Sequence, residues 1–200
     1  MKNVYLFVLT VVGVTLGIHM LYTQKATKKF PDIVVTSEAF DANMPIPAEY
    51  TCEGRNVPPP LAWHLVPPGT RSFALLMEDP AASGGRSWVH WLVYDMPAYR
   101  TKLLAREYVQ LSQGEGDEKM SAEVRAEQLG KEGLNSWKKE SYGGPCPPEG
   151  KHRYIFTIFA LDVETLGLTG GATKEHVLGA MKGHVLATGS LTGTYERRIP

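Results

Sequence analysis

Three long runs of strand-forming residues constrain most strongly what this chain can fold into. The runs are RSFALLMEDP (71–80), WVHWLVYDMP (88–97) and HRYIFTIFALD (152–162). Each is rich in β-branched, aromatic and other apolar residues, and each ends at an aspartate or a proline, which are frequent in turns. Because the runs are nearly continuous rather than strictly alternating, they predict strands that are buried on both faces or that lie inside a sandwich.

Shorter segments add two strands and two helices to this pattern. DIVVTS (32–37) and the glycine-containing VLATGSLTGTYERR (185–198) predict further strands. In TKEHVLGAMKGHVL (173–186), apolar residues recur at intervals of three and four after Thr173, a residue suited to cap a helix N-terminus. GDEKMSAEVRAEQLGKEG (116–133) predicts a second helix, which is mostly charged and ends at a glycine.

The order of these elements predicts the fold class. Strands predominate along the chain and do not alternate regularly with helices, which excludes a doubly wound α/β fold. We therefore expect a mainly β protein, an antiparallel β-sandwich with peripheral helices. The segment from about 101 to 140 is the least hydrophobic part of the domain, and we interpret it as a surface insertion.

The N-terminal segment, residues 1–29, predicts a membrane anchor or a signal followed by a polar linker. Residues 3–24 contain no Lys, Arg, Asp or Glu. A membrane-spanning helix needs roughly 20 apolar residues, whereas the apolar region of a cleaved signal has about 7 to 15. The absence of a small-x-small cleavage site also favours an uncleaved hydrophobic helix. A single domain is then expected over residues 30–200.

The side of the membrane that the domain faces is left open by two opposing signals. Three lysines follow the hydrophobic segment and one precedes it, which by the positive-inside rule argues against export. The two cysteines, Cys52 and Cys146, could form a disulfide in an exported domain, and closing so long a loop is worth about 4 to 5 kcal/mol. They could instead be two buried, unpaired thiols in a reducing compartment. We favour an extracytoplasmic domain.

The composition is that of an ordinary globular domain without an electrostatic preference for nucleic acid. Hydrophobic residues make up 43% of the chain and charged residues 21%, and the formal net charge is +0 from 21 basic and 21 acidic residues. Proteins that bind nucleic acid usually carry an excess of basic residues. We therefore expect no nucleic-acid partner.

Four polar residues lie in or at the ends of the predicted strands and could form a site. Asp79 ends the first long strand, His90 lies within the second, and His152 opens the third, with Tyr154 two residues further on. If these strands are neighbours in a sheet, one carboxylate, two imidazoles and a phenol converge beside YGGPCPPEG (142–150). A loop so rich in glycine and proline has a restricted shape, which indicates that it holds something in place.

Such a set of groups suits a small anion. An imidazole beside a carboxylate is favoured in its protonated form, and imidazolium N–H and phenol O–H groups donate hydrogen bonds to phosphate oxygens. The backbone N–H groups of Gly143 and Gly144 could approach an oxyanion closely because glycine has no side chain. Strict alternation places His90 on the same face as Trp88 and Leu92, so an indole would help to wall the cavity.

Other interpretations of these residues remain open. His90 can be a hydrogen-bonded core histidine, and Asp79 before Pro80 can be a turn-forming aspartate. Two histidines and a carboxylate also match zinc and non-haem iron ligand sets. However, no closely spaced histidine pair and no CxxC pair supports a metal, and we expect none. No GxSxG, Walker or Rossmann motif occurs, so we expect neither a nucleophilic hydrolase nor a nucleotide cofactor.

Four sequence blocks resemble a known family. They are YTCEGRNVPPPLAW (50–63), LLMEDPAA (75–82), WVHWLVYDMP (88–97) and YGGPCPPEGKHRY (142–154). In this order they are similar to the signature blocks of the phosphatidylethanolamine-binding proteins, and most similar to the bacterial Raf-kinase-inhibitor-like branch. The resemblance extends from Phe30 to the end of the chain. It implies an antiparallel β-sandwich with peripheral helices and a small pocket for phosphate, acetate or a phosphoethanolamine head group.

The resemblance also implies which residues bind the ligand. Carried over block by block, the ligand-binding residues are Asp79, Trp88, His90, Gly144, Pro147, His152 and Tyr154. Two features depart from the family pattern: DPAAS (79–83) stands where the family commonly has DPDAP, and the segment 101–140 is longer than expected. GLNSW (133–137) resembles the asparagine-containing approach to the glycine loop.

We expect a non-catalytic, envelope-located protein that binds a small anion or a phosphorylated head group and is held at the membrane by its N-terminal helix. An alternative is a regulator that inhibits a kinase or a hydrolase through the rim of the pocket, with the inserted helix as a candidate partner surface. A metal-dependent hydrolase is the third alternative.

Overall fold

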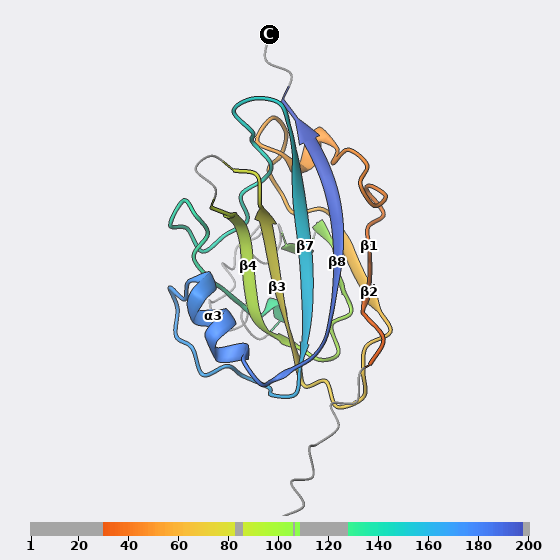
Figure 1. Cartoon of the computed structure of the whole chain (residues 1–200), viewed down its shortest axis with the longest axis vertical. Coiled ribbons are helices and arrows are strands. Elements are labelled where there is room, and N and C mark those ends of the chain that lie inside the picture. The colour runs from red at the N-terminus through yellow and green to blue at the C-terminus, as the bar shows by residue number, and fades with distance from the viewer. Residues whose placement is uncertain (1–29, 83–85, 106, 109–127, 198–200) are drawn as a thin grey trace, which may run out of the picture.

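Two antiparallel β-sheets form the protein, as its computed structural model shows for residues 30–82, 86–105, 107–108 and 128–197 (Figure 1). The large sheet has the order β6 (Lys131–Glu132), β4 (Trp88–Pro97), β3 (Ser72–Asp79), β7 (Lys151–Leu161) and β8 (Val185–Glu196). The small sheet has the order β1 (Val34–Thr36), β2 (Leu61–His64) and β5 (Lys102–Leu103). The described residues also contain the 3-10 helix η1 (Ala48–Tyr50) and the α-helix α3 (Lys174–Met181). The mainly β prediction is therefore confirmed.

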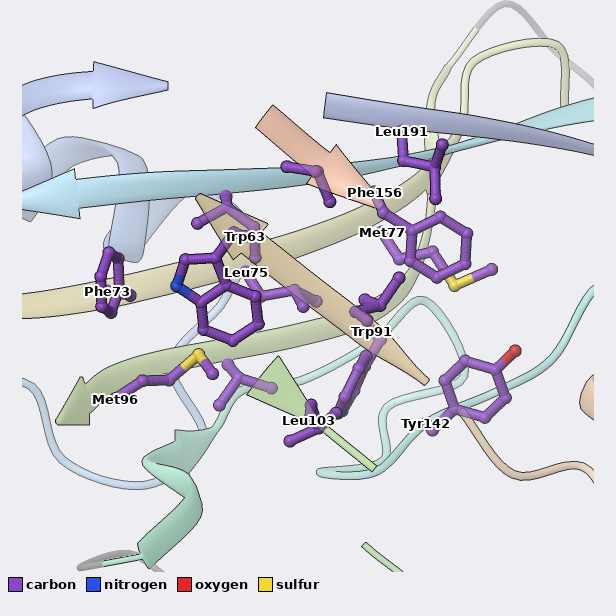
Figure 2. Packing of buried hydrophobic residues seen from close by; sticks show 14 of the residues in the cluster. Trp63, Phe73, Leu75, Met77, Trp91, Met96, Leu103, Tyr142, Phe156 and Leu191 are labelled. Atoms are coloured by element: carbon purple, nitrogen blue, oxygen red, sulfur yellow. The ribbon is translucent and has the colours of Figure 1, made fainter. Parts of the chain in front are cut away.

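The main hydrophobic core lies between the two sheets. Trp63 of β2 packs edge-on against Phe73 of β3, with their ring centroids 5.6 Å apart. Figure 2 shows these two rings together with Met77, Trp91 and Leu103. Strands β2 and β5 of the small sheet and strands β3 and β4 of the large sheet contribute these side chains. Because fully burying one such side chain contributes about 1.5 to 3 kcal/mol, this interface is the principal source of stability.

A second core covers the outer face of the large sheet. Leu76 of β3 and Leu92 of β4 pack with Val177 and Met181 of α3, and Figure 1 shows α3 beside these strands. β3 is therefore buried on both faces, which is why its sequence reads as one continuous apolar run. The N-cap prediction is confirmed, because the Thr173 side chain accepts a hydrogen bond from the backbone N–H of His176.

Two predicted segments fall wholly or mostly outside the described residues. The N-terminal hydrophobic helix (1–29) is one of them. Within the part of the chain that the structure describes, no helix is long and apolar enough to cross a membrane. The predicted helix 116–133 is the other. Of its described residues, 128–129 are helical and the helix ends at Gly130, which has φ 88°, so a glycine does end it, but Lys131 and Glu132 form β6 instead of helix.

The ends of the segment 101–140, interpreted above as a surface insertion, belong to the fold itself. Leu103 in β5 is 1% exposed and sits in the main core, and Tyr108 and Leu129 are buried there as well. Asn135 is buried too. The boundaries of the interpretation were therefore wrong. In the sequence, isolated apolar residues in a polar segment indicate burial only weakly, although here they anchor the segment to both sheets.

Candidate functional site

The predicted site residues meet at one end of the large sheet because of the strand order. β3 runs antiparallel to both β4 and β7, so its last residues lie between the first residues of those strands. Asp79 at the end of β3 pairs with Trp88 at the start of β4, and His152 is the second residue of β7. A cavity of about 240 Å³ opens there, lined by Asp79, Ala82, Trp88, His90, Trp137, Cys146, Pro147, Pro148, His152 and Tyr154.

His90 reaches this cavity through a β-bulge. Met77 pairs with Trp91 and Glu78 pairs with Val89, so His90 is the additional residue on β4 between two pairs. A bulge changes the alternation of side chains. His90 lines the cavity, while Leu92 packs in the outer core beneath α3. The alternation rule was therefore wrong in placing Leu92 on the face of His90.

Asp79 is buried and holds the ring of His152. Its Oδ2 accepts a hydrogen bond from His152 Nδ1 at 2.6 Å, and its Oδ1 accepts one from the backbone N–H of Ala81 at 2.9 Å. The Asp79 residue is only 3% exposed. With both carboxylate oxygens engaged and Nδ1 fixed, Nε2 is the nitrogen of His152 that remains for a ligand in the cavity.

His90 is held equally firmly, but by the backbone. Its Nδ1–H donates to the carbonyl oxygen of Gly143 at 2.7 Å, and the N–H of Gly143 donates to the His90 carbonyl at 3.0 Å. The His90 ring packs edge-on against Tyr154 and Trp137, with centroids 5.0 and 5.1 Å apart. Burial lowers the pKa of His90, since a low-dielectric environment disfavours the charged imidazolium.

Tyr154 supplies a buried hydroxyl to the same cavity. The residue is fully buried; the backbone N–H of Cys146 lies close enough to lower the pKa of the phenol, but the hydroxyl makes no hydrogen bond of regular geometry with any described residue. Burial raises the pKa of Tyr154, and the negative charge of Asp79 raises it further. The phenol therefore stays protonated and is available as a hydrogen-bond donor. A buried polar group of this kind normally has a partner, so a ligand or water is its natural one.

Two indoles form the mouth of the cavity. Trp88 and Trp137 are 37% and 42% exposed and pack edge-on against each other at 5.4 Å. Asn135 positions the second indole, because its Oδ1 accepts hydrogen bonds from the N–H groups of Trp137 and Lys139. The motif analysis included GLNSW but did not select Trp137 as a site residue. The tryptophan that ends GLNSW, the block that resembles the approach to the glycine loop, is the signal that could have identified it.

The glycine- and proline-rich loop is fixed to the segment around η1. A disulfide joins Cys52 to Cys146, and the N–H of Cys52 donates to the carbonyl of Pro145. The N–H of Gly144 donates to Oδ1 of Asn56 at 2.8 Å. The loop therefore holds Cys146 and Pro147 as one wall of the cavity and gives His90 its carbonyl partner.

The two glycine N–H groups are not directed at a ligand, contrary to the sequence-based expectation. Gly143 uses its N–H for His90 and Gly144 uses its N–H for Asn56, and neither residue is among those that line the cavity. Their lack of a side chain serves close packing instead. A Cβ on Gly144 would lie 2.6 Å from both Asn56 Oδ1 and the Tyr50 carbonyl oxygen.

Replacing Gly143 with alanine is expected to displace Trp137 from the mouth of the cavity. The new Cβ would lie 2.5 Å from Trp137 Cζ3, so the indole must shift from its position at the mouth. We expect a loss of about 1 to 3 kcal/mol in the free energy of unfolding, as in other overpacked sites, and an altered near-UV circular dichroism spectrum. Gly179→Ala in α3 is the matched control, because no atom lies within 4 Å of its Cβ. An unchanged tryptophan signal in Gly143→Ala would contradict the packing described here.

The charge of the site comes from few groups. Among the described residues that line the cavity, there is one carboxylate and two imidazoles, but no lysine or arginine. No cluster of three or more His, Cys, Asp or Glu side chains in the described part of the chain has the arrangement to hold a metal ion. Both cysteine sulfurs are joined to each other, so neither is a thiolate ligand.

Comparisons with known proteins find related sequences over most of the chain. The family model described as phosphatidylethanolamine-binding protein matches residues 36–196. A relative from Aquifex aeolicus, named UPF0098 protein, is 39% identical over 165 residues, which cover 82% of this chain and 88% of the relative. A second UPF0098 protein, from Methanothermobacter thermautotrophicus, is 39% identical over 161 residues, which cover 80% of this chain and 97% of that one. These names state no function.

Two solved structures are also similar to the chain over most of its length. A phosphatidylethanolamine-binding protein homolog from Chlamydia trachomatis superimposes with a TM-score of 0.67 at 36% identity, covering 83% of this chain and 98% of the homolog. YbcL from E. coli, described as a new member of the mammalian PEBP family, superimposes with a TM-score of 0.69 at 30% identity, covering 84% and 100%.

Proposed function

The chain belongs to the phosphatidylethanolamine-binding protein family, and from that premise we propose that the cavity beside Asp79 binds a small oxyanion or a phosphorylated head group without catalysing a reaction. The observation that carries the proposal is the buried hydroxyl of Tyr154. Tyr154 lines the cavity, and its hydroxyl makes no hydrogen bond of regular geometry with any described residue. The nearby Asp79–His152 pair fixes a second potential donor beside it.

The size of the cavity supports a small ligand. Its volume of about 240 Å³ lies below the range of about 300 to 1,000 Å³ that is usual for drug-sized molecules. The indoles of Trp88 and Trp137 and the rings of Pro147 and Pro148 form much of its wall. Apolar walls exclude water and strengthen each polar contact inside, so a single phosphoryl or carboxyl group could be held by few hydrogen bonds.

The side chains and N–H groups around the cavity support binding rather than group transfer. Among the described residues of the cavity wall, there is no serine, threonine or lysine, and the sulfur of Cys146 is in a disulfide. The raised pKa of Tyr154 keeps its hydroxyl protonated and makes it a poor nucleophile. The N–H groups of Gly143 and Gly144, which could have formed an oxyanion hole, donate within the protein.

Titration with phosphoethanolamine, followed by NMR of the histidine rings, tests this proposal. We expect the ring signals of His90 and His152 to shift in a saturable manner at millimolar concentrations. His184 is the internal control, because it pairs with Asp162 at the opposite end of β7 and is exposed. Equal shifts of all three rings would indicate a general salt effect. If His90 and His152 do not respond, the cavity does not bind the head group.

We also propose that the domain lies outside the cytoplasm and is tethered by its N-terminal segment. The disulfide between Cys52 and Cys146 supports this location, since such bonds persist in oxidising compartments and are rare in reducing ones. Thiol labelling of intact cells, with and without reductant, measures both the compartment and the pairing. Labelling of both cysteines without reductant would place the domain in a reducing compartment.

A further inference from the structure

We propose that the group bound in this cavity carries a proton on the oxygen that meets His90, so that the preferred ligand is a monoprotonated oxyanion such as the monoanion of a phosphate monoester. This inference rests on the proposed function and makes its ligand class narrower. It follows from the hydrogen bond that fixes His90 and from the charges around it.

The contact between His90 and Gly143 determines which ring nitrogen carries the hydrogen. A carbonyl oxygen can only accept, so the Nδ1 that lies 2.7 Å from the Gly143 oxygen must be the N–H nitrogen. In the neutral ring, Nε2 then has a lone pair and accepts a hydrogen bond. Burial lowers the pKa of His90 and keeps the ring neutral around pH 7. His90 therefore offers an acceptor to the cavity, which reverses the donor role expected from the sequence.

The groups that face His90 disfavour a doubly charged ligand. Asp79 on β3 supplies a carboxylate, and His152 and Tyr154 on β7 supply an imidazole and a phenol. The net charge of these groups is −1 when His152 is neutral and zero when it is protonated. Because no lysine or arginine is present in the described wall, a dianion would have no excess positive charge to compensate it in a partly desolvated site.

A monoprotonated phosphoryl group matches the donors and acceptors that remain. Its charged oxygens accept from the hydroxyl of Tyr154 and, when it is protonated, from His152 Nε2. Its P–OH group donates to His90 Nε2. A phosphodiester has the same charge but no hydrogen to donate, so the lone pair of His90 would face an oxygen lone pair. Leaving one buried acceptor unpaired corresponds to weaker binding by roughly 10- to 100-fold.

Methyl phosphate and dimethyl phosphate are matched probes for this inference. Near pH 5.5 both are mainly monoanions, because the second pKa of a phosphate monoester is about 6. We expect isothermal titration or NMR to show that methyl phosphate binds roughly 10- to 100-fold more tightly than dimethyl phosphate there. Raising the pH to about 7.5 should weaken the binding of methyl phosphate by on the order of 20-fold, because its monoanion is depleted. Dimethyl phosphate keeps its charge over this range, so any change in its binding measures the titration of the protein itself.

Nitrogen NMR of His90 provides the direct readout. In the complex, Nε2 should carry no bonded hydrogen and should shift as a hydrogen-bond acceptor, while Nδ1 stays protonated. His90→Gln, whose side-chain oxygen can stand near the Nε2 position, should keep the preference for the monoester. His90→Asn keeps an amide near Gly143 but has no acceptor at the Nε2 position, so this variant should lose the preference for the monoester. The comparison of the two ligands on the unmodified protein does not depend on how either variant folds.

The outcomes separate this inference from the proposed function. Equal binding of the two esters near pH 5.5, or a protonated Nε2 in the complex, would overturn the inference while leaving an oxyanion site. Absence of binding by both esters would contradict the proposed function. Preference for the monoester, lost in His90→Asn and kept in His90→Gln, is the result that supports it.

Discussion

Replacing Cys52 and Cys146 together with serine is expected to lower the free energy of unfolding by about 4 to 5 kcal/mol. The two residues are 94 positions apart, and the disulfide restricts the unfolded chain by closing this long loop. For a protein of this size, each kcal/mol corresponds to about 2 to 4 °C in Tm. The double variant should therefore melt roughly 10 to 15 °C below the unmodified protein in a thermal or urea unfolding experiment.

The same substitution should also loosen the cavity, because Cys146 forms part of its wall. Reductant supplies the control: it should lower the Tm of the unmodified protein toward that of the double variant and leave the variant unchanged. The loop retains other attachments, including the hydrogen bond from the Tyr142 hydroxyl to the Tyr50 carbonyl. A destabilisation below about 1 kcal/mol, the usual net contribution of one hydrogen bond, would show that these attachments suffice without the disulfide.

The long strands could be predicted from the sequence because their signal is local. β3, β4, β7 and β8 are 8 to 12 residues long and contain the apolar runs themselves. β2, β5 and β6 were missed. They have two to four residues each, too few for a periodic pattern, and they are defined by pairing with distant strands rather than by their own residues.

Most of the residues that line the cavity could be expected from the sequence, but their hydrogen bonds required the structure. Asp79, His152 and Tyr154 converge as expected because antiparallel neighbours bring opposite strand ends together. The role of His90 depends on a bulge in β4 and on the Gly143 carbonyl, which are tertiary features. Trp137 was not selected because it comes from an irregular loop, where the sequence has no period to indicate which way a side chain faces.

Replacing Asp79 with alanine is the second large effect that we expect, a loss of about 3 to 5 kcal/mol in the free energy of unfolding. The carboxylate accepts from both His152 Nδ1 and the Ala81 N–H, and its removal leaves both donors without an acceptor in a buried place. The downfield NMR signal of the His152 Nδ1 hydrogen should also disappear, because this hydrogen would then exchange freely with solvent. Urea unfolding and proton NMR measure the two effects.

Asp162→Ala is the matched control, since the chain contains a second pair of the same chemistry. Asp162 Oδ1 accepts from His184 Nδ1 at 2.8 Å, close to the 2.6 Å of the site pair, but its two side chains are 44% and 44% exposed against 5% and 14% for Asp79 and His152. Water replaces the lost partner at the exposed pair, so its removal should cost about 0 to 1 kcal/mol. If both variants lose equal stability, burial does not strengthen the Asp79–His152 contact. Asp79 would then not be the residue that fixes His152 for a ligand.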